Sequence, residues 1–170
     1  MPRIHVCSLA LVEETVEKSG ARSLVTLLSP GTPIVRPRQI APERHLAIGV
    51  ADIVEAAPGS ILPADAHVRE LLDFVARWDR AAPLLIHCFA GVSRSTAAAF
   101  IAVCALAPQR EEGEIARALR EASPTATPNT RLVALADATL RRAGRMTRAI
   151  EQIGRGEACF EGMPFALEIE

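Results

Sequence analysis

The sequence contains no tyrosine, one tryptophan and five phenylalanines among its 170 residues. So few aromatic side chains exclude a surface that binds nucleic acid by base stacking. Charge of one sign is also lacking, because 19 basic residues are balanced by 20 acidic ones to give a net charge of −1. Neither nucleic acid nor an anionic membrane is therefore expected as a partner.

Long apolar runs are missing too. No segment approaches the ~20 apolar residues that cross a bilayer, and the first residues, MPRIHVCSLA, lack the apolar stretch of a signal peptide. We therefore predict a cytoplasmic protein that does not associate with membranes. Lys18 is the only lysine among the 19 basic residues, a bias that is typical of GC-rich genomes and indicates a bacterial origin.

Cysteine is present, but not in pairs. Cys7, Cys88, Cys104 and Cys159 are far apart and form no CxxC motif, which excludes a zinc site of the usual spacing. A cytoplasmic chain of this length needs no disulfide framework. We expect four buried thiols, and we predict neither a metal nor a cofactor.

The composition that remains is that of a globular domain, with 49% hydrophobic and 23% charged residues. A chain of this length can bury a core without cross-links, so we expect a single domain over residues 1–170. Residues 64–79 place apolar side chains at spacings of three and four, the pattern of an amphipathic helix. Residues 95–107 are almost entirely apolar, so we expect a buried helix there.

Strands alternate with helices in the first half of the chain, and helices dominate the second half. The pattern predicts an α/β fold with a central, mostly parallel sheet of about four to five strands, flanked by helices, and a helical C-terminal half. Residues 156–170 show no periodicity and receive no prediction. The predicted strands are 2–7, 23–29, 45–50 and 83–87, and the predicted helices are 9–19, 64–79, 95–107, 111–122, 128–143 and 145–153.

The segment HCFAGVSRS, residues 87–95, carries the strongest functional signal. It joins a predicted strand to a predicted buried helix, so Cys88 follows the carboxyl end of a strand, where open α/β sheets bind ligands. Successive backbone N–H groups at a helix N-terminus form an anion-binding nest, and Gly91 permits the tight backbone that such a nest needs. We expect phosphate or sulfate to bind in this loop.

Side chains of the segment add reactive chemistry to the nest. Five residues separate Cys88 from Arg94, whose planar guanidinium can hold two oxygens of a phosphate. A cation and a helix N-terminus stabilise a thiolate, so we expect Cys88 to be a nucleophile. Ser95 is placed to donate a hydrogen bond to the sulfur and ease its departure in a second step. His87 is expected to orient the loop rather than to act on the substrate.

The segment resembles the phosphate-binding loop of the cysteine-dependent protein tyrosine phosphatase superfamily: His-Cys, two residues, Gly, two residues, Arg-Ser. The pattern is most similar to that of small dual-specificity phosphatases, bacterial ones among them. Residues 50–52 resemble the loop that carries their acid, residues 63–78 their connecting helix, and residues 124–135 the helix after their site. The resemblance covers roughly residues 22–142.

The resemblance implies the family's fold and a metal-independent hydrolysis of phosphate monoesters through a phosphocysteine at Cys88. It also implies a general acid that protonates the leaving oxygen. Asp52 matches that acid, because it alone among the five aspartates follows a predicted strand into a loop, and Glu55 is the second candidate. The implied phosphate-binding positions are Phe89, Ala90, Gly91, Val92, Ser93 and Arg94.

The substrate remains open at this point. The variable loop positions are uncharged, whereas relatives that act on inositol phosphates often carry lysine there, and a chain without tyrosine cannot build the tyrosine wall of phosphotyrosine-specific relatives. A phosphorylated protein, a small phosphorylated metabolite or an inositol phosphate all remain possible substrates. A catalytically weak pseudophosphatase, or a module that binds phosphorylated ligands without turnover, is the alternative to an enzyme.

Two further enzyme classes are disfavoured by arrangement. Rhodanese-type sulfur transferases mostly have one residue fewer between cysteine and arginine, and low-molecular-weight phosphatases place the loop at the N-terminus, before the acid. Outside the loop, Arg36, Arg38 and Arg44 are candidates for guiding a polyanion to the site. The remaining arginine cluster, Arg141, Arg142, Arg145 and Arg148, is predicted to be a solvated helix face.

Overall fold

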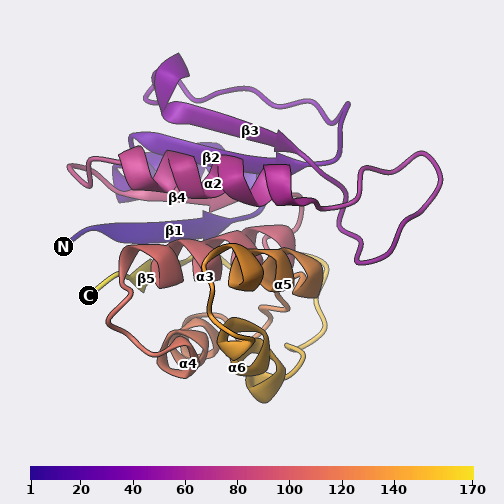
Figure 1. The fold of residues 1–170 in the computed structure, drawn as a ribbon. Coiled ribbons are helices and arrows are strands. Elements are labelled where there is room, and N and C mark those ends of the chain that lie inside the picture. Colours follow the sequence, from indigo (N-terminus) through magenta and orange to yellow (C-terminus); the bar gives the residue numbers. More distant parts are fainter.

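The computed structural model describes all 170 residues and is built around one five-stranded sheet. The strands β1 to β4 run parallel, and β5 pairs antiparallel with β1, in the order β3-β2-β4-β1-β5 (Figure 1). This arrangement confirms the predicted, mostly parallel sheet. The strand bounds are β1 Arg3–Cys7, β2 Ser23–Leu28, β3 His45–Gly49, β4 Leu84–His87 and β5 Phe165–Glu168.

The two central strands are buried along their whole length. Every residue of β2 and of β4 is buried, which fits their continuous apolar sequences, SLVTLL and LLIH. Parallel strands have such continuous apolar sequences when helices cover both faces of the sheet. The strand β3 has only one buried residue, Ile48, because it lies at one edge of the sheet.

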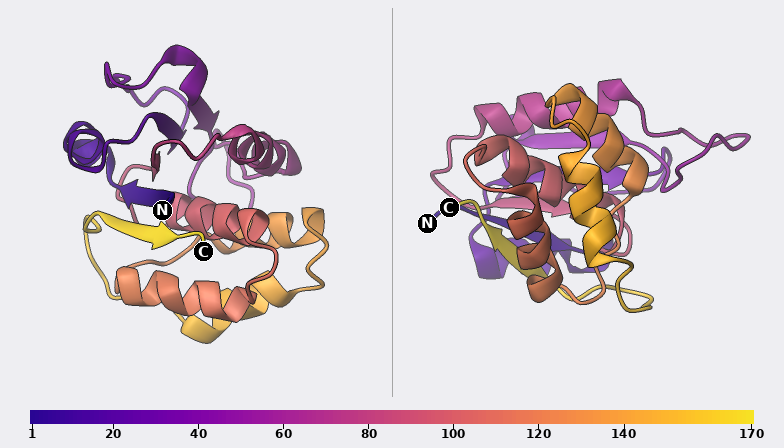
Figure 2. Two further views of the ribbon diagram at one scale, coloured as in Figure 1. Left: turned by 90° about the vertical axis from the view of Figure 1, so that its left-hand side faces the viewer. Right: turned by 60° about the horizontal axis from the view of Figure 1, so that its bottom comes forward.

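The helices cover the two faces unequally. The helix α1 packs on one face through Val12 and Val16, against Leu24 and Leu85 of the sheet. The larger core lies on the other face, where α2 and α3 contact the sheet, α5 packs against α2 and α3, and α4 and α6 pack together below them (Figures 1 and 2). None of the helices is long and apolar enough to span a membrane. The helix bounds are α1 Val12–Ser19, α2 Asp65–Arg77, α3 Arg94–Leu106, α4 Glu112–Ala122, α5 Thr130–Thr139 and α6 Arg145–Ile153, with 3-10 turns η1 Leu9–Leu11 and η2 Pro42–Arg44.

The helix predicted over residues 128–143 is shorter than expected. It ends at Thr139, because Arg141 and Ala143 adopt left-handed φ angles of 55° and 52° that no α-helix accommodates. The predicted solvated arginine face is wrong for one of its four members, Arg142, whereas Arg141, Arg145 and Arg148 are exposed. Arg142 is buried, and its guanidinium donates to Glu112 Oε1 at 2.8 Å and to the carbonyl of Cys104 at 2.8 Å. The backbone turn directs this side chain inward.

The C-terminal tail, which had no predicted structure, folds back onto the body of the molecule. Its strand β5 lies beside β1 at the edge of the sheet, as Figure 2 shows in yellow. Four residues of an edge strand are too few to display a periodicity. The tail also corrects the prediction of four buried thiols, because Cys159 is exposed whereas Cys7, Cys88 and Cys104 are buried.

Candidate active site

The predicted phosphate-binding loop joins β4 to α3 at the carboxyl end of the parallel strands. His87 is the last residue of β4, and Arg94 is the first residue of α3. Because β1 to β4 are parallel, all their carboxyl ends lie on this side of the sheet, on the right in Figure 1. Ser8, Ser29 and Asp52 follow the neighbouring strands there and surround the loop that begins at Cys88.

Gly91 is required by a close approach between the loop and the end of β1. It adopts a left-handed φ of 71°, and a Cβ atom at this position would lie 2.9 Å from the carbonyl carbon of Cys7 and 2.9 Å from the nitrogen of Ser8. Real Cβ atoms do not approach backbone that closely. Both the φ angle and the contact therefore admit only glycine here.

Cys88 lies in the best place for a nucleophile among the four thiols. Its Sγ is 3.0 Å from the Oγ of Ser95, which can donate to a thiolate, and the N-terminus of α3 follows directly. Burial raises the pKa of the Cys7 thiol to about 12, and burial raises that of Cys104 to about 12 as well. Those two thiols therefore stay protonated and unreactive at neutral pH.

Arg94 is buried and only partly satisfied. Its Nη1 donates to the carbonyl of Val50 at 2.9 Å and lies 3.4 Å from the Oγ of Ser29, which anchors one side of the guanidinium. Its Nε is buried and has no partner. A buried cationic N–H without an acceptor is costly, and a phosphate oxygen would supply the missing acceptor. The arrangement fits an anion held by the free side of the guanidinium.

His87 belongs to a buried chain of hydrogen bonds that ends at the loop. Its Nδ1 lies 3.0 Å from the carbonyl of Cys88, so Nδ1 carries the proton and donates. Burial lowers the pKa of His87 to about 4, which leaves the ring neutral at pH 7. Its Nε2 then accepts from the Oγ1 of Thr26 at 2.8 Å, and that oxygen accepts from Nε2 of His45 at 2.8 Å. This hydrogen bond orients the peptide at Cys88, and the role of His87 in positioning the loop stays a prediction.

Asp52 is exposed at the rim of the site and is held through one of its two oxygens. Its Oδ1 accepts from the Oγ of Ser93 at 2.6 Å and from the Nδ2 of Asn129 at 3.0 Å. The first bond connects the predicted acid to the phosphate-binding loop, and Oδ2 makes no hydrogen bond. Glu55 lines the same surface depression as Asp52, Ser93 and Asn129.

Asn129 is the site residue that the sequence interpretation missed. Its position was recognisable only as the start of a helix, and it does cap α5, because its side chain accepts from the N–H of Leu132 at 3.0 Å. The amide group of the same side chain donates to Asp52 and, at 3.2 Å, to the carbonyl of Ile53. Since 77 positions separate Asn129 from Asp52, no local signal reveals this second role.

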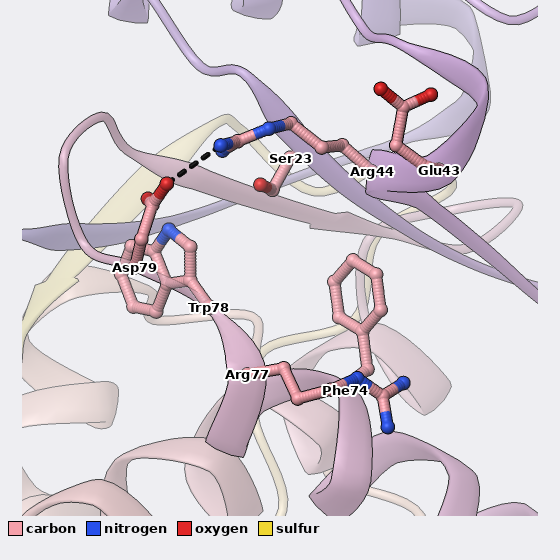
Figure 3. Close-up of a pocket in the computed structure, with 7 residues that line it drawn as sticks. All are labelled: Ser23, Glu43, Arg44, Phe74, Arg77, Trp78 and Asp79. Atoms are coloured by element: carbon pink, nitrogen blue, oxygen red, sulfur yellow. Dashed lines mark hydrogen bonds and ion pairs between the residues drawn. The ribbon is translucent and has the colours of Figure 1, made fainter.

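One of the three arginines proposed as guides for a polyanion, Arg44, lies away from the site. Arg44 is ion-paired with Asp79 at 2.6 Å in a small pocket beside Ser23 and Trp78 (Figure 3). Ser23 is the first residue of β2, so this pocket lies at the amino end of the parallel strands, whereas Cys88 lies at their carboxyl end. The guanidinium of Arg36 is bound to the carbonyl of Ile40. The expectation is therefore wrong for Arg44.

The structure thus brings Cys88, Arg94 and Ser95 together in one loop, to which Ser93 connects Asp52. These contacts place the residues, while their roles stay predictions. No group of three His, Cys, Asp or Glu side chains is arranged to hold a metal ion.

Comparisons with known proteins identify the fold. No protein-family model matches the sequence, and no curated protein matches it. Among solved structures, DUSP15 is 20% identical with a TM-score of 0.64 over 93% of this chain and 96% of that one. Human DUSP28 is 19% identical with a TM-score of 0.61 over 82% and 94%. PTPMT1, solved in complex with PI(5)P, is 11% identical with a TM-score of 0.60 over 88% and 93%. These similarities confirm the fold that the resemblance implied.

Proposed function

We propose that this chain, which has the fold of the dual-specificity phosphatases, hydrolyses phosphate monoesters through a phosphocysteine at Cys88. The observation that carries the proposal is a loop in which the sulfur of Cys88 lies 3.0 Å from a hydroxyl and the buried Nε of Arg94 lacks an acceptor. A nucleophile and a buried N–H that can donate to an anion occur together there. A protein that only needed a stable loop would gain nothing from a buried guanidinium N–H without an acceptor.

In the first step, the substrate's phosphate binds to the loop amides and to Arg94, and the thiolate of Cys88 attacks phosphorus. A P–S bond forms as the P–O bond to the leaving group breaks, and Asp52 gives its proton to the leaving oxygen. The guanidinium and the amides of the loop stabilise the charge on the phosphoryl oxygens in the transition state.

In the second step, water attacks the phosphocysteine and releases inorganic phosphate. Asp52, now ionised, accepts a proton from the water as the P–S bond breaks. The hydroxyl of Ser95 donates a hydrogen bond to the departing sulfur, 3.0 Å away, and so favours its release as a thiolate. Neither step requires a metal ion.

The substrate we propose is a phosphorylated protein side chain or a small phosphate monoester. The loop offers little attraction for a substrate with several phosphate groups, because the positions between Cys88 and Arg94 are uncharged and Phe89 is 63% exposed. An inositol phosphate is the second candidate, favoured by the PI(5)P in the PTPMT1 structure. A single domain over residues 1–170 and a cytoplasmic location stay predictions.

The proposal is tested by hydrolysis of a small aryl phosphate between pH 5 and 8 in the presence of EDTA. We expect turnover by the wild type, none by Cys88→Ser, and a loss of roughly 10²-fold or more for Asp52→Ala, the scale of a general acid. Activity that survives in Cys88→Ser would place the nucleophile elsewhere. An inactive wild type whose Cys88→Ser variant still binds phosphate analogues would instead identify a binding module.

A further inference from the structure

The loop that carries Cys88 has its carbonyl groups held from outside. The N–H of Leu9 donates to the carbonyl of Phe89 at 3.1 Å, and the N–H of Thr127 donates to that of Val92 at 2.9 Å. In a trans peptide the C=O and the N–H point in opposite directions. Each outward carbonyl that finds a donor therefore turns the next N–H toward the interior of the loop, where an anion binds.

The C-terminal tail supplies the same support at the centre of the loop. The N–H of Gly162 donates to the carbonyl of Ala90 at 2.8 Å, in the peptide that also carries the N–H of Gly91. Gly162 is buried, and a Cβ atom added to it would lie 2.8 Å from the carbonyl oxygen of Gly91. The tail thus contacts two successive loop residues through backbone, and only a residue without a side chain fits there.

This part of the tail is itself fastened along its length. The N–H of Glu157 donates to the carbonyl of Pro124 at 2.9 Å, and the N–H of Gly156 donates to the Oγ1 of Thr127 at 3.1 Å. Further along, the hydroxyl of Ser8 donates to the carboxylate of Glu161. Residues 156–162, which we call the tail strap, therefore connect the end of β1 and the α4–α5 connection to the loop.

We propose that Gly162 is a positioning residue for phosphate binding, because its N–H and its lack of a side chain orient the peptide that presents the Gly91 amide to the anion. This deepens the function proposed above, on which its catalytic meaning rests, but anion binding tests it without turnover. The tail strap is then part of the active-site architecture rather than only an edge of the sheet.

The test compares the wild type with Gly162→Ala by titration calorimetry of tungstate, a tetrahedral analogue of phosphate. The added methyl group must displace the Gly91 carbonyl, so we expect the Kd for tungstate to rise roughly 10-fold, the effect of weakening one hydrogen bond to a charged ligand. The KM for an aryl phosphate should rise with it. The matched control is Gly113→Ala on α4, where the new Cβ would meet only the flexible end of Arg117 at 3.4 Å, and its Kd should be unchanged.

A folded Gly162→Ala protein, as judged by circular dichroism, that binds tungstate as tightly as the wild type overturns the inference. If Gly162→Ala does not fold, Ser8→Ala tests the inference instead. This substitution removes the hydrogen bond that the Ser8 hydroxyl donates to Glu161 of the tail strap, and it neither changes charge nor adds volume. We then expect a Kd about threefold higher, and an unchanged Kd overturns the inference. Tungstate binding by a wild type that has no turnover refutes the phosphatase function alone, and no binding refutes both.

Discussion

At the scale of single residues, the orientation of Asp52 depends on a hydrogen bond from Asn129, the residue that caps the start of α5. Asn129 and Ser93 both donate to Oδ1 of Asp52, at 3.0 and 2.6 Å. Because these bonds occupy one oxygen, the proton that a general acid transfers belongs on the other one. In the proposed mechanism, the two donors therefore define which oxygen of the Asp52 carboxyl group gives its proton to the leaving oxygen.

Replacing Asn129 by Ser should separate this role from helix capping. Serine retains the capping acceptor of α5 but is too short to donate to Asp52, so we expect stability to change little and kcat to fall roughly 10-fold, since misplaced groups cost rate steeply. Asn129→Ala should lose the cap as well, at about 1 kcal/mol of stability.

Steady-state kinetics with two aryl phosphates of different leaving-group acidity check this prediction. The loss in Asn129→Ser should be smaller for the more acidic phenol, because that leaving group needs less help from a proton. Equal losses for both substrates would show that Asn129 acts on something other than the acid.

At the scale of elements, one buried carboxylate organises the boundary between α5 and α6. Asp137 lies within α5, and its Oδ1 accepts from the N–H of Gly144 at 2.7 Å. Its Oδ2 accepts from the N–H of Met146 at 2.7 Å and from that of Thr147 at 3.3 Å. The side chain of one helix thus caps the N-terminus of the next, which stabilises the turn between them.

We expect Asp137→Ala to lower the free energy of unfolding by about 2–4 kcal/mol, because it leaves N–H groups at the start of α6 without their charged acceptor. Urea unfolding followed by circular dichroism measures the change. Asp73→Ala on the exposed side of α2 is the matched control and should stay within about 0.5 kcal/mol of the wild type. A similarly small effect at Asp137 would mean that water replaces the carboxylate as the cap.

At the scale of the whole molecule, one buried histidine, His87, and two half-buried ones, His5 and His45, make stability depend on pH. Burial lowers the pKa of His87 to about 4, and burial also lowers the pKa values of His5 and His45. Below pH ~6.5 the unfolded chain binds protons at these rings, while the folded protein does so only at lower pH. The folded state therefore loses stability as the pH falls from about 6.5 toward 4.

For His87 alone this linkage amounts to about 3 kcal/mol between pH 7 and pH 4. Urea titrations of the wild type and of His87→Asn at pH 7, 6, 5 and 4 measure it. Asparagine can still donate to the carbonyl of Cys88 but does not titrate, so its stability curve should be flatter by that amount. Parallel curves for the two proteins would contradict the assignment of His87 as a buried neutral ring.

The amino-acid sequence by itself determined the four parallel strands, most helix positions and the segment from Cys88 to Ser95 that joins β4 to α3. These features depend on neighbours along the chain: apolar runs, helical spacing, and a strand followed by a glycine-containing loop and a helix. Asp52 was identified as well, because it alone among the five aspartates follows a predicted strand into a loop and matches the acid that the family resemblance implies.

Only the tertiary structure decided what holds those residues in place. Asn129 meets Asp52 from 77 positions away, and Ser8 meets Glu161 from 153 positions away. Arg142 turns inward, Arg44 pairs at the amino end of the parallel strands, and the tail strap reaches the loop at Gly162. Such contacts depend on which surfaces the packed sheet and helices bring together, and a periodicity along the chain carries no information about them.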